Sequence, residues 1–139
     1  MGGFPTTTEF ELSVTGSSKD LLGMIAVLAE QSINLDTVAT AKIGDRYVIR
    51  FLTGCEEESR RTFIKADIPF KERRVLAIDM YNRPGQWLRA ARCLVDSGIE
   101  LDSSYLLGQK GDRLRFVFGV TDYQKAKKVA EQIAECSVD

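Results

Sequence analysis

Along the first half of the chain, apolar residues recur first with the two-residue period of a strand and then with the spacing of a helix face. Two further strand-like runs flank Ile43-Gly44-Asp45, a predicted hairpin turn whose glycine can take positive φ. A second helix starts with glutamates, as the helix dipole favours, and stops before Pro69. The predicted elements are a strand over 10–14, a helix over 19–31, strands over 34–42 and 46–53, and a helix over 56–66.

The second half repeats this order, starting from a long alternating strand. The predicted elements are strand 71–81, helix 86–97, strands 100–108 and 112–121, and helix 124–136. The first of these helices carries one apolar stripe, made of Trp87, Leu88, Ala91, Leu94 and Val95, and Gly98 is its expected C-cap. Because three residues are too few for a closing strand, strand 71–81 is expected to serve both halves.

An internal repeat supports this reading. Ser32-Ile33-Asn34-Leu35-Asp36 resembles Gly98-Ile99-Glu100-Leu101-Asp102, 66 residues further on. Leu22 and Leu28 fall on Leu88 and Leu94 at the same offset. Duplication of one β-α-β-β-α-β unit therefore explains the pattern.

The fold class predicted is α+β, with two ferredoxin-like βαββαβ modules in tandem, antiparallel sheets and helices on one face. Residues 1–9 are expected to be a flexible lead-in, 10–74 the first module and 75–139 the second. A single chain of this kind leaves sheet surface uncovered, so a homodimer is expected.

Composition excludes several classes of function. Among 139 residues, 19 Lys and Arg nearly balance 20 Asp and Glu, which argues against a surface that neutralises nucleic-acid phosphates. The longest uncharged apolar stretch, 21–29, is far shorter than the roughly 20 residues of a membrane span. The chain opens without a secretory signal, so a cytoplasmic protein is expected.

The titratable residues give little support for catalysis. The chain has no histidine, which removes Ser-His and Cys-His pairs and imidazole metal ligands. Cys55, Cys93 and Cys136 lie too far apart for a CxxC site and are expected to be isolated reduced thiols. Asp79 is expected to be a solvated strand-end residue or a cap partner. We expect no enzyme activity, no metal and no cofactor.

The segment between strand 71–81 and the next helix is the best candidate for chemistry. Asn82 suits an N-cap, Pro84 suits the first helical turn, and Gly85 allows close approach of another backbone. The free N–H groups of a helix start can bind an anion such as a small carboxylate. Two interpretations stand at this point: an anion site, or a turn that merely starts a helix.

Asn82-Arg83-Pro84-Gly85-Gln86-Trp87-Leu88, followed by Gly98-Ile99-Glu100-Leu101, resembles the ACT domain pattern, in which Asp/Asn-x-Pro-Gly-x-Leu follows a strand and Gly-Ile-Asn-Ile follows the helix. The similarity extends over nearly the whole chain from about Phe10 and is greatest to small stand-alone tandem ACT proteins. The resemblance implies a non-enzymatic regulatory protein that binds an amino acid at an interface between modules and modulates an enzyme of amino-acid metabolism.

Carried over by position, the resemblance assigns the ligand-facing turn to Asn82, Arg83, Pro84, Gly85 and Gln86. It assigns the second-strand edge of a neighbouring module to Ile99, Glu100 and Leu101, or to Ile33, Asn34 and Leu35. The turn of the first module, Gly16-Ser17-Ser18-Lys19, lacks the Pro-Gly pair and is expected to be degenerate; Asp20 comes too late to replace Asn82.

Two rival functions stay open. One is a protein-interaction or regulatory subunit module without a ligand of its own. The other is an RNA-recognition module, because Lys110-Gly111 and Arg115-Phe116-Val117-Phe118 echo a signature of such sheets. Phe116 and Phe118 alternate on one face and are expected in the core, as is Trp87, so RNA binding is the less favoured rival.

Overall fold

The computed structural model describes residues 6–136, so the part of the predicted lead-in over 1–5 lies outside the described residues. Its elements are β1 (Thr6–Thr15), α1 (Ser18–Glu30), β2 (Leu35–Ile43), β3 (Arg46–Thr53), α2 (Glu56–Lys65), β4 (Lys71–Tyr81), α3 (Gln86–Asp96), β5 (Leu101–Lys110), β6 (Arg113–Val120) and α4 (Tyr123–Cys136). The predicted α+β fold is confirmed, with the helices and strands in the predicted order. The chain divides into two compact units, one of them Thr8–Arg73 and the other starting at Arg74.

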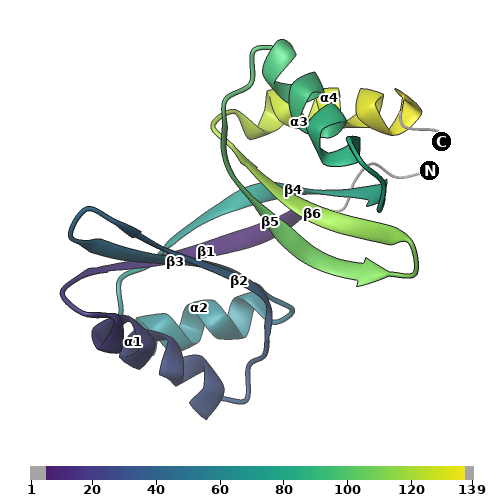
Figure 1. Cartoon of the computed structure of the whole chain (residues 1–139). Coiled ribbons are helices and arrows are strands. Elements are labelled where there is room, and N and C mark those ends of the chain that lie inside the picture. Colours follow the sequence, from purple (N-terminus) through teal and green to yellow (C-terminus); the bar gives the residue numbers. More distant parts are fainter. Residues whose placement is uncertain (1–5, 137–139) are drawn as a thin grey trace. The chain divides into compact units, whose positions relative to one another are not determined.

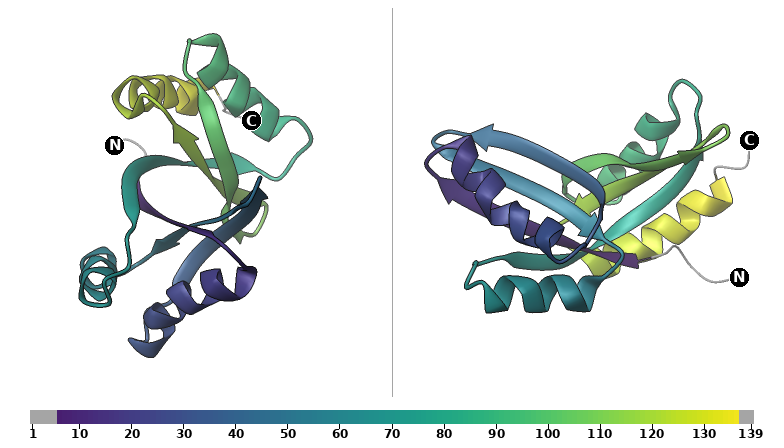
Figure 2. Two further views of the ribbon diagram at one scale, coloured as in Figure 1. Left: turned by 90° about the vertical axis from the view of Figure 1, so that its left-hand side faces the viewer. Right: turned by 90° about the horizontal axis from the view of Figure 1, so that it is seen from below.

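The first unit is an antiparallel sheet, in the order β2-β3-β1, with α1 and α2 on one face (Figure 1, Figure 2). Successive side chains of a strand point to opposite faces of the sheet, so every second side chain packs against the helices. Phe10, Phe51 and Phe63 contribute their rings to this core from β1, β3 and α2, with centroids 5.7 to 6.3 Å apart.

The second unit repeats this arrangement with strand order β4-β6-β5 and helices α3 and α4 (Figure 1). Leu76, Ile78 and Met80 of β4 face the helices, and Phe118 of β6 lies among them without exposed surface. Phe116 packs against the same core, as predicted. Since these rings are turned toward the helices, they are not available as a platform for stacked bases.

β4 joins the two units, as the shared strand was expected to do. At its start, Glu72 pairs with Arg60 of α2 (Oε1 to Nη2 2.6 Å), and Arg73 pairs with Glu9 of β1 (Nε to Oε1 2.9 Å). From Leu76 onward β4 pairs with β6, in the register Leu76↔Phe118. The Glu9 side chain is 1% exposed, and β1 begins at Thr6. The lead-in expected over 1–9 was therefore wrong for residues 6–9, which are strand.

α1, α2 and α3 end in the same way. In each case the second residue beyond the C-cap donates its N–H to a carbonyl five residues back: Ile33 to Leu28, Ile68 to Phe63, and Ile99 to Leu94. This is a Schellman motif, which requires a left-handed residue just before that isoleucine. The left-handed residue after α3 is Gly98 (φ 83°), which follows the C-cap Ser97 and is not itself the C-cap. After α1 and α2 the left-handed residues are Ser32 (φ 58°) and Asp67 (φ 56°).

The stripe predicted on α3 is only partly buried. Leu94 and Ala91 lie in the core, but Leu88 is 50% and Val95 52% exposed. Ala90, which lies outside the predicted stripe, is buried as well, so the buried face of the helix consists of Ala90, Ala91 and Leu94. Leu22, the repeat equivalent of Leu88, is likewise 62% exposed.

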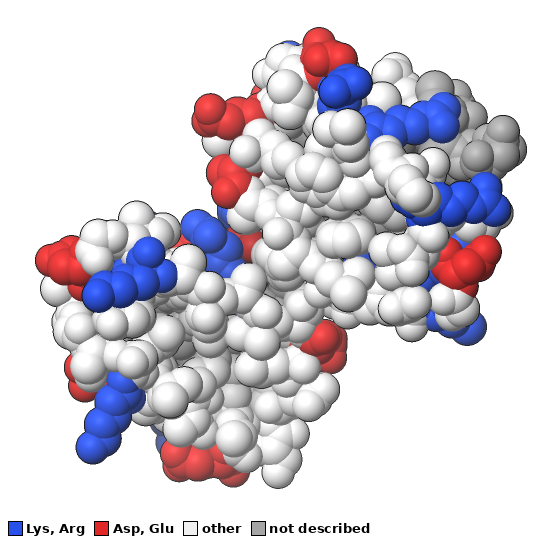
Figure 3. All heavy atoms as spheres, in the orientation of Figure 1, with Lys and Arg blue, Asp and Glu red and all other residues white. Residues whose placement is uncertain are grey.

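Charge is mixed on the surface. On the face shown in Figure 3, basic and acidic side chains alternate among uncharged ones, so no broad basic field of the kind that binds nucleic acid covers that face. Within the described residues, every helix falls short of the length and apolar character that a bilayer span requires.

Candidate functional site

The turn between β4 and α3 has a defined backbone conformation. Gln86 N donates to Arg83 O (3.3 Å), with Pro84 and Gly85 as the two central residues. Gly85 has φ 84° and ψ −7°, which are the values of the third residue of a type II turn. Asn82 N donates to Asp112 O (2.7 Å), which ties the turn to the β5–β6 hairpin. The Pro-Gly pair therefore fixes this turn by its intrinsic dihedral preferences.

Two details of the predicted helix start were wrong. The N-cap of α3 is Gly85 and not Asn82, and Pro84 lies before the helix and not in its first turn. The reason is the type II turn, which uses Pro84 and Gly85 as its corner and delays the helix to Gln86. A Cβ on Gly85 would meet no atom within 4 Å, so within this chain the glycine serves its positive φ and not a close backbone approach.

The N-terminus of α3 lacks the side chains that stabilise the other helix starts. Gly85 offers no side-chain cap, and the first turn contains no acidic residue. By contrast, α2 begins with Glu56, Glu57 and Glu58. Free N–H groups and the positive end of a helix dipole favour an anion. In α3 this role is left to a group from outside the helix.

In the first unit, the chain itself supplies the anion. Asp20 Oδ2 accepts hydrogen bonds from Ser17 N (3.1 Å) and Ser17 Oγ (3.0 Å), while Asp20 N donates to Ser17 Oγ (3.3 Å). This capping box closes the N-terminus of α1. Gln86 stands 66 residues after Asp20, the offset of the repeat, and has no charge. The turn expected to be degenerate is thus self-capped.

Tyr81, the last residue of β4, holds two arginines beside the turn. The Arg83 guanidinium carbon lies 4.6 Å from the Tyr81 ring centroid, and that of Arg113 lies 4.4 Å from it. Cation–π contacts of this length restrain both side chains, and Arg83 is itself a residue of the turn that precedes the helix.

Asp79 and Arg115 face each other across β4 and β6 as register partners. Arg115 donates from Nε to Oδ1 (2.6 Å) and from Nη2 to Oδ2 (3.0 Å). These hydrogen bonds hold the pKa of Asp79 below its usual value and raise the pKa of Arg115. The Asp79 side chain is 42% exposed near the end of β4, as expected for a solvated strand-end residue, but it is no cap partner, since both carboxylate oxygens are bound by one guanidinium.

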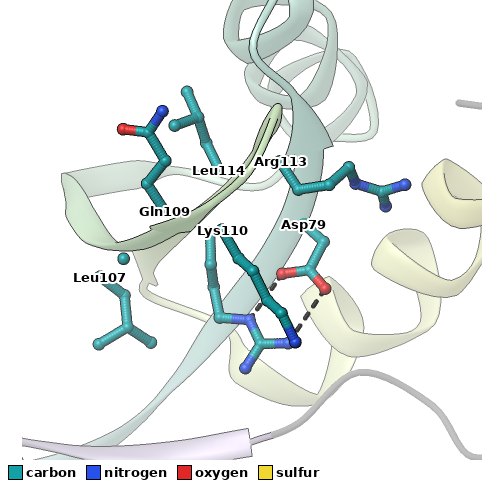
Figure 4. A pocket seen from close by; sticks show the side chains of 8 residues that line it. Asp79, Leu107, Gln109, Lys110, Arg113 and Leu114 are labelled. Carbon is teal, nitrogen blue, oxygen red and sulfur yellow. Dashed lines mark hydrogen bonds and ion pairs between the residues drawn. The ribbon is translucent and has the colours of Figure 1, made fainter.

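Beside this pair lies a cavity of about 430 Å³, at the ends of β4, β5 and β6 (Figure 4). It is lined by Asp79, Gln109, Lys110, Arg113 and Arg115, together with apolar and glycine positions of β5 and Leu114. Asp79 is the one acidic residue among the described residues that line it.

The other residues assigned by resemblance lie away from the turn. Leu101 pairs with Val120 and Tyr81 with Arg113, seven residues apart along β6, so the two ends are roughly 23 Å apart. Ile99 is 2% and Ile33 7% exposed, and the N–H groups of both are used in the Schellman motifs. Asn34 and Glu100 are exposed, and Leu35 pairs with Thr53. One unit alone therefore does not bring the turn and the strand start together.

Sequence reasoning missed Tyr81, Lys110, Arg113 and Arg115 as site residues. The signal that identifies them is register, because antiparallel pairing places Asp79 opposite Arg115 and Tyr81 opposite Arg113. Which strand pairs with β4 was not fixed by the alternation of apolar residues alone.

Trp87 borders the same end of α3. Its ring stacks on Phe118 (centroids 5.9 Å apart, planes at 18°), and its Nε1 donates to Ser104 Oγ (3.0 Å). The residue is 37% exposed, so it lies at the edge of the core and not within it.

Among the described residues, no cluster of Cys, Asp or Glu is arranged to hold a metal ion.

Comparison with known proteins supports the fold. No family model and no curated protein matches the chain. Among solved structures, protein BT0572 from Bacteroides thetaiotaomicron superimposes with a TM-score of 0.81 at 17% identity, over 93% of this chain and 89% of that one.

The regulatory subunit of aspartate kinase from Thermus thermophilus, in its ligand-free form, gives a TM-score of 0.66 at 11% identity, over 98% of this chain and 95% of that one. The corresponding subunit from Thermus flavus gives 0.60 at 9% identity, over 98% and 94%. The fold is therefore ACT-like, of the tandem kind seen in these regulatory subunits.

Proposed function

We propose that the protein is a non-enzymatic regulatory module that binds an amino acid, or a similar small carboxylate, at an interface between ACT-like modules and modulates an enzyme of amino-acid metabolism. The ligand carboxylate binds at the turn Asn82–Gln86. The observation that carries the proposal is the contrast between the two helix starts: α1 is capped by Asp20, whereas α3 has no acidic group of its own.

Charge at the turn favours a carboxylate. Arg83, a residue of the turn itself, contacts the Tyr81 ring, and the dipole of α3 points its positive end at the same turn. Each contribution is modest alone, because the turn is exposed to solvent. Together they select a small anion over a cation or a neutral molecule.

Completion of the site requires a second module. The strand starts Ile99–Leu101 and Ile33–Leu35 lie at the ends of their sheets remote from the hairpins, so a neighbouring module contributes one of them. A homodimer provides such a neighbour, and the exposed apolar residues Leu22, Leu88 and Val95 on the helices supply surface for association. Light scattering at high micromolar concentration tests this part; a monomeric mass there contradicts it.

The similarity to regulatory subunits supports an enzyme as the partner. Neighbours with the same tandem arrangement are regulatory subunits of aspartate kinase, so an enzyme of amino-acid metabolism is the class of partner proposed. Binding regulates only if the ligand has different affinity for two arrangements of the modules.

A thermal-shift screen against the twenty amino acids and a set of 2-oxo acids tests the ligand. At about 100 times its dissociation constant, a ligand stabilises by about 2.7 kcal/mol, which moves the unfolding midpoint by several degrees. We expect one or two members of the panel to do so. A flat panel contradicts amino-acid binding by the isolated chain.

The variant pair Gln86→Asp and Gln86→Asn tests the position of the site. Gln86→Asp places an acidic group at the first residue of α3, so it competes with the ligand carboxylate and weakens binding by about tenfold. The acidic group favours the helix start, so the melting temperature without ligand stays the same or rises. Gln86→Asn, which adds no charge, keeps the affinity within about threefold. Equal affinities of the two variants would place the ligand elsewhere.

The alternative is an interaction module without a ligand, favoured by the exposed Leu88 and Val95 on α3. In that case a metabolic enzyme is retained by the immobilised chain, but its binding and activity do not respond to any amino acid. Leu88→Ser with Val95→Ser then abolishes retention.

A further inference from the structure

A second potential site lies in the cavity at the ends of β4, β5 and β6, and none of the residues that line it belongs to the turn Asn82–Gln86. Its volume of about 430 Å³ lies within the range of about 300–1,000 Å³ that is usual for small-molecule pockets. All its lining residues belong to the second unit, so the cavity is complete within one unit (Figure 4).

The charges around the cavity do not balance. Lys110, Arg113 and Arg115 contribute three positive groups, and Asp79 contributes one negative group. Arg115 binds both oxygens of Asp79, at 2.6 and 3.0 Å, so these two cancel. Lys110 remains uncompensated by any acidic residue of the lining, and the charge of Arg113, which also helps to lower the pKa of Asp79, is only partly compensated.

The two remaining cations are suited to a doubly charged group. Arg113 is restrained by its contact with the Tyr81 ring (4.4 Å), so ordering it on binding costs little entropy. Lys110 is exposed at the end of β5 and is free to turn its ammonium toward a ligand. A guanidinium fork with a nearby ammonium is a common arrangement for phosphate, which offers more acceptor oxygens and more charge than one carboxylate.

A bulge shapes one wall of the cavity. The β5–β6 register shifts between Leu106 and Gly108, which leaves Leu107 without a register partner. Such bulges bend a strand and change the direction of its side chains, and they are common beside binding sites. Leu107 and Gly108 both line the cavity.

We propose that this cavity binds the phosphate group of a small phosphorylated molecule, held by Lys110 and Arg113. The site is separate from the amino-acid site proposed above and does not depend on it. Asp79 limits the affinity, because its carboxylate repels the ligand and occupies Arg115.

Titration with pyrophosphate at constant ionic strength, followed by calorimetry on the full chain, tests the proposal. We expect saturable binding below about 10 mM. Lys110→Ala weakens it by about tenfold, because one charged contact is lost. Asp79→Asn strengthens it by about threefold or more, because the repelling charge is removed and Arg115 is released. Succinate in place of pyrophosphate distinguishes a dicarboxylate from a phosphate ligand, and tighter binding of succinate overturns the assignment to phosphate.

Two controls separate the site from net charge. Lys128→Ala on α4 and Asp96→Asn at the end of α3 make the same charge changes at exposed positions outside the cavity, and we expect both to bind as wild type. Equal effects in the controls, or weaker binding by a folded Asp79→Asn variant, overturn the proposal. Unchanged pyrophosphate binding by the Lys110→Ala variant would also overturn the proposal. We expect the Gln86 variants to leave pyrophosphate affinity unchanged. A failure of the phosphate proposal can therefore be distinguished from a failure of the amino-acid site.

Discussion

At the scale of single residues, Asp79 and Arg115 show how the second unit uses charge. The pair spans two neighbouring strands with two hydrogen bonds, but its side chains are 42% and 43% exposed. Solvent screens a pair of this kind, so its contribution to stability is at most about 1 kcal/mol. Its main consequence is local: the pair occupies the Arg115 guanidinium and keeps Asp79 ionised beside the cavity.

The lowered pKa of Asp79 predicts the acid dependence of stability. A carboxyl whose folded pKa lies below its unfolded value contributes stability above the unfolded value, near 3.8, and loses it as pH falls through the folded pKa. Wild type is therefore expected to be slightly more stable than Asp79→Asn at pH 6, and this difference should shrink below pH 3.8 and vanish as the pH falls through the folded pKa. Urea unfolding followed by Trp87 fluorescence measures it, and a difference that persists at low pH would contradict the ion pair.

Some residue roles were visible in the sequence and some were not. The burial of Phe118 and the reduced access to Phe116 follow from their alternation on β6. The burial of Glu9 does not, because its partner Arg73 lies 64 residues away and a polar residue before Phe10 resembles a loop. The same holds for Tyr81, because one of its two arginines comes from the turn after β4 and the other from the start of β6.

At the scale of elements, the helix ends of the two units obey one rule. Each Schellman motif places a left-handed residue before a buried or half-buried isoleucine, and the repeat aligns Ser32-Ile33 with Gly98-Ile99. Glycine takes this conformation without steric cost, whereas serine pays about 1 kcal/mol. The two units thus differ in the strain stored at equivalent positions.

Reciprocal substitutions test that rule. Gly98→Ala should destabilise the second unit by about 1 kcal/mol, and its new Cβ would also lie 3.2 Å from Lys125 Nζ. Ser32→Gly should stabilise the first unit by about 0.5 kcal/mol. Trp87, the single tryptophan, reports the second unit by fluorescence, and circular dichroism reports both. Destabilisation by Ser32→Gly would show that the serine side chain matters more than its backbone conformation.

The limits of the helices were predictable to within one residue, but the roles of the residues before α3 were not. Pro84 was placed in the first turn of α3 because proline favours that position, yet the glycine that follows it favours the type II corner more strongly. The exposure of Leu88 and Val95 could not be predicted from helical spacing, because spacing fixes a face but not its tilt against the sheet.

At the scale of the whole molecule, duplication has produced two units that share a fold and differ at their turns. The tandem architecture was predictable because the 66-residue offset repeats the order of elements. The difference in capping was only partly predictable: the missing Pro-Gly pair of the first unit was visible, but the return of the Asp20 carboxylate to Ser17 required the structure.

This difference makes the number of ligands per chain the most direct test. With the amino acid that gives the largest thermal shift, isothermal titration calorimetry should find one site per chain, because the turn of the second unit is open and that of the first is closed by Asp20. Two equivalent sites per chain would show that Asp20 does not close the first turn. One site that survives Gln86→Asp unchanged would contradict the assignment to the second turn.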